Sequence, residues 1–103
     1  MKKYRRQKME SLILEHLSFL ILKEFEFPAL VTITNIKIDD EFKNAKAIIK
    51  ILPKDFKNAK KFKNQEIKIL KELNDNQNKI FKILLKKLNI KPLPKIIFQL
   101  SKD

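Results

Sequence analysis

Hydrophobic residues recur every three or four positions near the start of the chain, which is the spacing of an amphipathic helix. The stripe consists of Met9, Leu12, Ile13, His16, Leu17, Leu20 and Ile21. It predicts a helix from Arg5 to Phe25 that ends before Pro28. Because His16 lies on the apolar stripe, we expect a core or boundary residue there and no catalytic role.

Two segments after Pro28 alternate between apolar and polar residues, as β-strands do. The first covers residues 30–38, and its alternation changes phase near Thr34 and Asn35, which predicts a β-bulge. The second covers residues 45–52 and places Ala47, Ile49 and Ile51 on one face. The connector between them, residues 39–44, is polar and short enough for an antiparallel hairpin.

Helical spacing returns after Pro53, where a lysine-rich stretch leads into a predicted helix over residues 62–73. A polar run at residues 74–78 interrupts this pattern, which resumes to residue 90. Residues 95–100 alternate again and form the third predicted strand. The order is αββααβ, and two helices before the last strand imply a crossover, so we expect the third strand to run parallel to the first.

Size and charge narrow the class of protein. The chain has 103 residues, enough for one domain, and we treat residues 1–103 as a single α+β domain. Its net charge is +12, with lysines interleaved among apolar residues, which indicates a folded body with a cationic surface that binds a polyanion. A proteome rich in A/T codons would also raise the lysine count without functional meaning.

The composition argues against an enzyme or a cofactor-binding protein. The chain has no Cys, no Gly and a single His, so it lacks a thiol nucleophile, a glycine-rich phosphate loop and a multi-histidine metal site. The acidic residues 39–41 suit a hairpin turn better than a magnesium site. We expect no cofactor, no metal and no small-molecule substrate. No segment has the length and hydrophobicity of a membrane span or the form of a signal peptide, and we expect a cytoplasmic protein.

Three segments resemble the ribosome-binding factor A family. Residues 86–98 resemble the family signature, a basic helix end followed by Pro94, Ile96 and Phe98. Residues 36–49 resemble its strand, acidic turn and second strand, which opens at Ala45. Pro28, after the first helix, corresponds to a proline of the family.

The resemblance implies a type II KH-like fold with a three-stranded mixed sheet, helices packed on one face and a kinked helix pair at residues 74–78. It also implies a monomeric, non-catalytic factor that binds the 30S ribosomal subunit during its maturation and contacts the 16S rRNA. The family has an Ala-x-Gly kink between its later helices, and here residues 76–78 take that place. We expect Asn78 to carry the bend in a left-handed conformation, because Asn tolerates that conformation best after Gly.

The candidate rRNA-binding residues follow from charge and position, and each set also has an ordinary structural explanation. They are Lys79, Lys82 and Lys86 for phosphates, Asn76, Gln77 and Asn78 for backbone or base edges, Lys46 and Lys50 as the opposite wall of a groove, and Arg5 and Arg6 for phosphates. A solvated helix face with a capping Asn cluster would explain the first two sets equally well. For the basic connector with Lys54, Lys57, Lys60 and Lys61, a solvated loop is the ordinary expectation, and steering of association is the functional alternative.

Two other functions stay open at this point. The chain also fits a general KH-like nucleic-acid-binding protein that is not dedicated to the ribosome. A peripheral membrane protein would use Leu14, Phe19 and Leu22 of the first helix, but the glutamates of the same segment argue against docking on anionic lipid.

Overall fold

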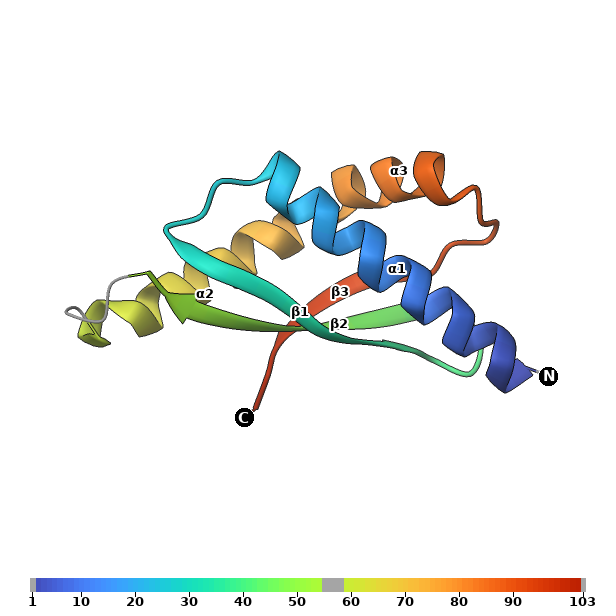
Figure 1. Ribbon diagram of the computed structural model, residues 1–103, viewed down its shortest axis with the longest axis horizontal. Coiled ribbons are helices and arrows are strands. Elements are labelled where there is room, and N and C mark those ends of the chain that lie inside the picture. The colour runs from blue at the N-terminus through green and yellow to red at the C-terminus, as the bar shows by residue number, and fades with distance from the viewer. Residues whose placement is uncertain (1, 55–58, 103) are drawn as a thin grey trace.

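The computed structural model describes the backbone of residues 2–54 and 59–102 and the side chains of residues 4–54 and 63–102. Figure 1 shows the elements in the predicted order. They are α1 (Lys2–Glu24), β1 (Ala29–Ile38), β2 (Asn44–Pro53), α2 (Ala59–Asp75), α3 (Gln77–Leu88) and β3 (Lys95–Leu100). The α+β class and the element order are therefore confirmed.

The three strands form one mixed sheet in the order β1-β2-β3. The β1–β2 hairpin is antiparallel, and its register shifts between Ile33 and Asn35, so the predicted bulge is present. β3 runs parallel to β2 and therefore antiparallel to β1, so the expected β1–β3 orientation was wrong. A helical crossover starts where one strand ends and carries the chain back to the end of the sheet at which that strand began, so the two strands that it joins, here β2 and β3, run parallel.

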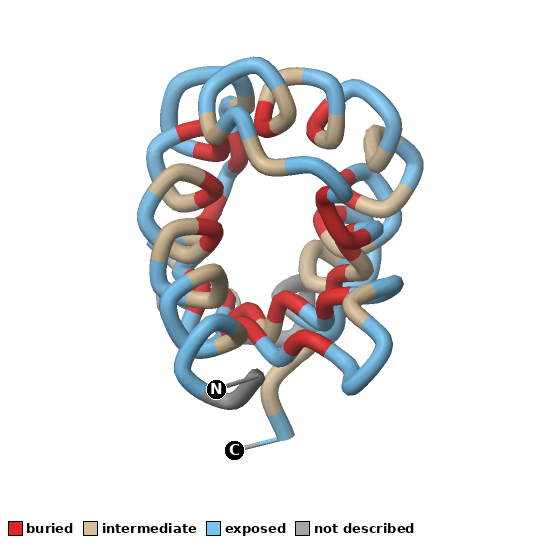
Figure 2. Tube along the Cα trace, turned by 90° about the vertical axis from the view of Figure 1, so that its right-hand side faces the viewer, coloured by how far each residue is buried: buried red, intermediate tan, exposed pale blue. Residues whose placement is uncertain are grey.

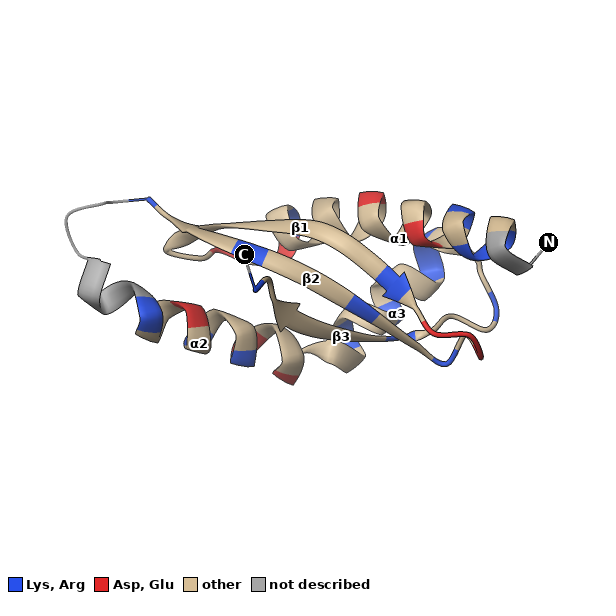
Figure 3. Ribbon diagram, turned by 90° about the horizontal axis from the view of Figure 1, so that it is seen from below, with Lys and Arg blue, Asp and Glu red and all other residues tan. Residues whose placement is uncertain are grey.

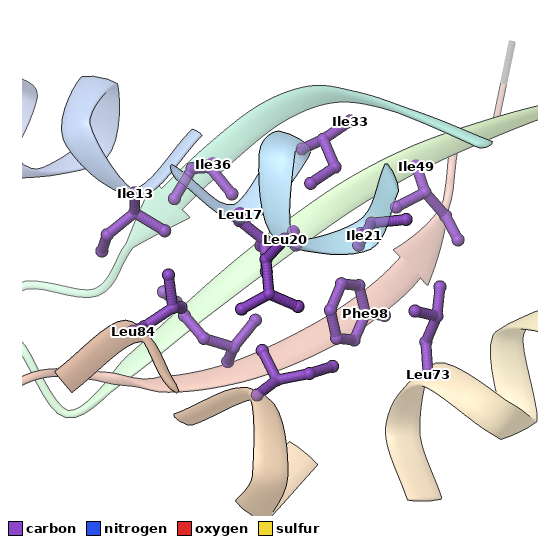
Figure 4. Close-up of a cluster of buried hydrophobic side chains, with 14 of the residues drawn as sticks. Ile13, Leu17, Leu20, Ile21, Ile33, Ile36, Ile49, Leu73, Leu84 and Phe98 are labelled. Carbon is purple, nitrogen blue, oxygen red and sulfur yellow. The ribbon is translucent and has the colours of Figure 1, made fainter. Parts of the chain in front are cut away.

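The helices cover one face of the sheet and leave the other face open (Figure 1). Buried residues face the space between the two layers, whereas exposed residues line the outside (Figure 2). All six elements contribute to one apolar cluster, part of which Figure 4 shows. Its members include Ile13 and Leu17 of α1, Ile33 of β1, Ile49 of β2, Leu73 of α2, Leu84 of α3 and Phe98 of β3. His16 is half-buried, at the boundary of this core.

The kink between α2 and α3 is made by Asn76, whose φ and ψ are −101° and 17°. The Asn76 N–H donates to the carbonyls of Glu72 and Leu73, at 3.2 Å each. Asn78 lies inside α3, and its expected left-handed conformation was wrong. The reason is that the Ile80 N–H donates to the Asn76 carbonyl at 3.0 Å, and this helical bond spans Asn78. Among the described residues, those in the left-handed conformation are Phe42 and Asn89.

Candidate nucleic-acid interface

Lys79, Lys82 and Lys86 form a row along α3, which we call the α3 lysine row. Their spacing of three and four residues places them on one side of the helix, while Ile80 and Leu84 are buried against the sheet layer. All three lysines are exposed. Neither ion pair found in the described part of the chain involves this row. The row therefore offers three uncompensated cations to an anionic partner.

The three amide residues at the kink do not behave alike. The Asn76 side-chain amide donates to the Glu72 carbonyl at 2.7 Å, and the Gln77 amide donates to Asn74 Oδ1 at 3.0 Å. These two side chains therefore hold the kink in place. Asn78 is exposed beside Lys79, so it is the member of this group that faces solvent without such a contact among the described residues.

Asn74 has a role that the sequence pattern did not reveal. Its side chain pairs with the backbone of Phe98 in β3, accepting from the Phe98 N–H at 2.9 Å and donating to the Phe98 carbonyl at 3.2 Å. This pairing fixes the kink against the outer strand. In the sequence, Asn74 looks like one more residue of a polar interruption, and no local signal links it to a strand more than twenty residues away.

The two arginines of α1 have different surroundings. The Arg6 guanidinium pairs with the Asp40 carboxylate at 2.5 Å and so joins α1 to the β1–β2 turn. Arg5 is exposed and lines a hollow of about 280 Å³ together with Met9, Phe42, Ile90, Lys91 and Pro92. Arg5 is thus available to an anion, whereas Arg6 already has an acidic partner.

Lys46 and Lys50 lie on the open face of the sheet, because their neighbours Ala45, Ala47 and Ile49 face the helices. The sheet therefore separates both lysines from the α3 lysine row, and the two sets do not form opposite walls of one groove. Lys37 of β1 and Lys95 of β3 share this open face. Neither lysine was predicted from the sequence, although the phase change at the bulge could have placed Lys37 on this face.

The acidic turn between β1 and β2 is held together by its own hydrogen bonds. Asp39 accepts from the Lys43 N–H at 2.9 Å and from the backbone and side-chain N–H groups of Asn44 at 3.1 and 3.2 Å. Desolvation raises the pKa of Asp39, whereas the hydrogen bonds lower it, and their combined effect is the larger. The pKa of Asp39 therefore lies below the ordinary value of 3.8. Within the described chain, no group of three or more His, Asp or Glu residues is arranged to hold a metal ion.

Of the basic connector, the structure describes little. Lys54 donates to the Phe27 carbonyl at 3.2 Å, across from the end of α1. Lys57 lies outside the described residues, as do the side chains of Lys60 and Lys61. The backbone of Lys60 and Lys61 belongs to α2, so the expected loop was wrong for these two residues. The expected role of the connector in steering stays a prediction.

The apolar residues of α1 that suggested a membrane surface are partly exposed. Phe19 and Leu22 are 69% and 75% exposed, while Leu14 is half-buried against the core. Over the described ranges, no helix has the length and apolar character that crossing a bilayer requires.

Comparison with known proteins places this fold in a family. The family model of ribosome-binding factor A matches residues 5–103, which is nearly the whole chain. The chain belongs to the ribosome-binding factor A family. The family predicted from the resemblance is thereby confirmed. A comparison with curated protein sequences finds no match.

Solved structures of the family share this fold. A homology model of ribosome-binding factor A from Thermus thermophilus, fitted into a cryo-EM map of a 30S complex of that factor, superposes with a TM-score of 0.69 at 14% identity. The match covers 91% of this chain and 92% of that one. A crystal structure of ribosome-binding factor A from the same species gives a TM-score of 0.61 at 13% identity, over 97% and 94% of the two chains. The KH-like fold is thus shared across a low sequence identity.

Proposed function

We propose that this protein is a non-catalytic assembly factor of the small ribosomal subunit, which binds the 30S particle and its 16S rRNA during maturation. The family match over residues 5–103 carries this proposal. The net charge of +12 and the exposed α3 lysine row support RNA phosphate as the contacted group. The exposed Asn78, next to Lys79, and the exposed Arg5 of α1 add hydrogen-bond donors for RNA.

The mechanism follows from differential binding. A protein that binds one conformation of a precursor more tightly than the others increases the population of that conformation. Completion of the bound surface, or arrival of a later ligand at the same place, then releases the protein. This mechanism needs no nucleophile, metal or cofactor from the chain.

The test is sedimentation of a lysate that contains the tagged full-length protein, with detection in small-subunit, large-subunit and whole-ribosome fractions. We expect the protein in the small-subunit fractions at low salt and its loss as salt rises, because phosphate contacts release counterions. Its presence only in ribosome-free fractions at low salt, across growth conditions, would contradict the proposal. Equal affinity for arbitrary duplex DNA and for small-subunit rRNA would favour a general nucleic-acid-binding protein instead.

The α3 lysine row is tested with the variant Lys79→Gln, Lys82→Gln, Lys86→Gln. Losing three phosphate contacts should weaken binding to isolated small subunits by on the order of 10- to 100-fold at moderate salt. The matched control carries the same charge change on exposed positions of α2, as Lys63→Gln, Lys68→Gln, Lys71→Gln. Equal losses in the two variants would show that net charge, and not this row, determines binding.

A further inference from the structure

The open face of the sheet carries exposed lysines from all three strands. Figure 3 views the molecule from this side, with basic positions on the strands and no acidic ones, in agreement with the sequences of β1, β2 and β3. Its exposed lysines are Lys37, Lys46, Lys50 and Lys95. The helices cover the opposite face, so this surface lies on the far side of the molecule from the α3 lysine row.

Three of these lysines cluster at one end of the sheet. Lys37 lies directly opposite Lys46 in the β1–β2 register. Lys95 pairs with Asn44, two residues before Lys46 on the same face. Side chains directly opposite on neighbouring strands are about 5 Å apart at Cβ, and like charges at that position destabilise a sheet. An anion bound between them would remove this repulsion.

No acidic side chain in the described part of the chain neutralises the cluster. The carboxylates that adjoin these strands in the chain belong to the β1–β2 turn, and each already has a partner. Asp40 pairs with Arg6, Glu41 pairs with Lys43 at 3.2 Å, and Asp39 accepts hydrogen bonds from the turn itself. The positive charge of the open face is therefore left for an external anion.

The surface suits the phosphates of a folded RNA better than unpaired bases. The strand residues between the lysines are Thr32, Asn35, Gln99 and the half-buried Ile48 and Ile97. None of the three strands places an aromatic side chain on this face as a platform for base stacking. Lys46 and Lys50 extend roughly 13 Å along β2. Hydroxyl and amide side chains among lysines are typical of contacts to a nucleic-acid backbone, which do not depend on base sequence.

We propose that the open sheet face is a second RNA-binding surface and that the protein bridges two RNA segments, one on this face and one on the α3 lysine row. The inference rests on the proposed function, because that function supplies RNA as the polyanion. The bridge would hold two rRNA elements of an immature particle at a fixed separation, set by the sheet and the helix layer between them.

A bridging assay tests this arrangement. Two batches of one short RNA duplex, labelled with a donor and an acceptor fluorophore, are mixed with substoichiometric full-length protein. We expect energy transfer between the duplexes for the wild-type protein and for the α2 control variant. The variant Lys37→Gln, Lys46→Gln, Lys95→Gln should lose the transfer but still bind one duplex. Its salt dependence should also be shallower, by about 2 to 3 in the slope of log affinity against log salt.

A second measurement needs no variant. Chemical acetylation of lysines in the wild-type protein, read by mass spectrometry with and without RNA, should show protection of Lys37, Lys46 and Lys95 as well as of the α3 lysine row. Unchanged acetylation of these three, or full bridging by the variant that lacks them, would overturn the inference. A protein that bridges duplexes but never sediments with small subunits would instead refute the proposed function.

Discussion

A chain without glycine must use other residues wherever its backbone turns left-handed. Asn89 does so after α3, with φ of 52°, and its N–H donates to the Leu85 carbonyl at 3.2 Å, which closes the last turn of the helix. Phe42 does so in the β1–β2 turn, with φ of 60°. Such a conformation costs a non-glycine residue roughly 1–2 kcal/mol, and Asn bears it best. The preference for Asn was recognised in the sequence but was assigned to Asn78, because several asparagines compete and only the hydrogen bonds decide between them.

The carboxylate of Asp39 makes the stability of the β1–β2 turn depend on pH. Its pKa in the folded protein lies below the ordinary value of 3.8, so the unfolded chain binds the proton more readily. The folded state therefore loses this stabilisation as pH falls below the ordinary value of 3.8 and through the lower pKa of the folded protein. We expect the melting temperature of the wild-type protein to exceed that of Asp39→Asn near neutral pH, and the difference to shrink toward pH 2.

Thermal unfolding followed by circular dichroism at a series of pH values checks this expectation. The comparison between the two proteins cancels the titration of the other carboxylates, which both chains share. A difference in melting temperature that stays constant down to pH 2 would mean that the charge of Asp39 does not stabilise the turn.

At the scale of elements, side chains of two helices form hydrogen bonds with backbone groups of the two outer strands of the sheet. Glu10 of α1 accepts from the Ile38 N–H of β1 at 2.9 Å, and Asn74 of α2 pairs with Phe98 of β3 through both its amide atoms. Each contact ties a helix to the edge of the sheet and satisfies a backbone group there.

Loss of the Asn74 amide should weaken the joint between the helix kink and β3. The Asn74→Ala variant leaves the Phe98 N–H and carbonyl without this partner, and we expect a loss of about 1–3 kcal/mol in the free energy of unfolding. Asn64→Ala, at an exposed position of α2, is the matched control and should change stability by less than about 0.5 kcal/mol. Urea unfolding measures both values, and equal losses would contradict the role of Asn74.

Local patterns predicted the elements because burial on one face imposes its period on the sequence. The α1 stripe and the alternation around Ile49 and Ile96 are such cases, and the phase change at Thr34 located the bulge. The direction of β3 relative to β1 was mispredicted because the crossover rule was applied to β1, although the two helices connect β2 to β3 and the hairpin makes β1 antiparallel to β2. The β2–β3 pairing arises instead from where the crossover returns, which is a property of the whole chain.

At the scale of the whole molecule, the candidate site was predictable only where it is helical. The α3 lysine row follows from residue spacing within one helix. Lys46 and Lys50 were recognised as cationic, but their position relative to α3 depends on which face of the sheet the helices cover. Lys37 and Lys95 become their neighbours only through the register of three strands. A surface shared between strands cannot be derived from any one of them.

The net charge of +12 on a molecule with extents of 48 × 26 × 18 Å should make its stability depend on salt. The Debye length falls from about 30 Å at 0.01 M salt to about 10 Å at 0.1 M salt. At low salt, charges therefore repel one another across the whole folded protein, whereas at higher salt only neighbouring charges do. Unfolding separates these charges, hence repulsion favours the unfolded chain. We expect the melting temperature to rise by on the order of a few degrees as NaCl increases over this range.

The clustered lysines of the open sheet face should account for part of this salt dependence, since Lys37 and Lys46 are directly opposite each other. The variant Lys37→Gln, Lys46→Gln, Lys95→Gln should therefore melt at a higher temperature than the wild type at low salt and respond less to added NaCl. The α2 control variant removes the same charge from positions along one helix and should show a smaller gain. If the melting temperature does not change with salt in any of the three proteins, repulsion among these lysines does not affect stability. The uncompensated charge assigned to the open face would then be wrong.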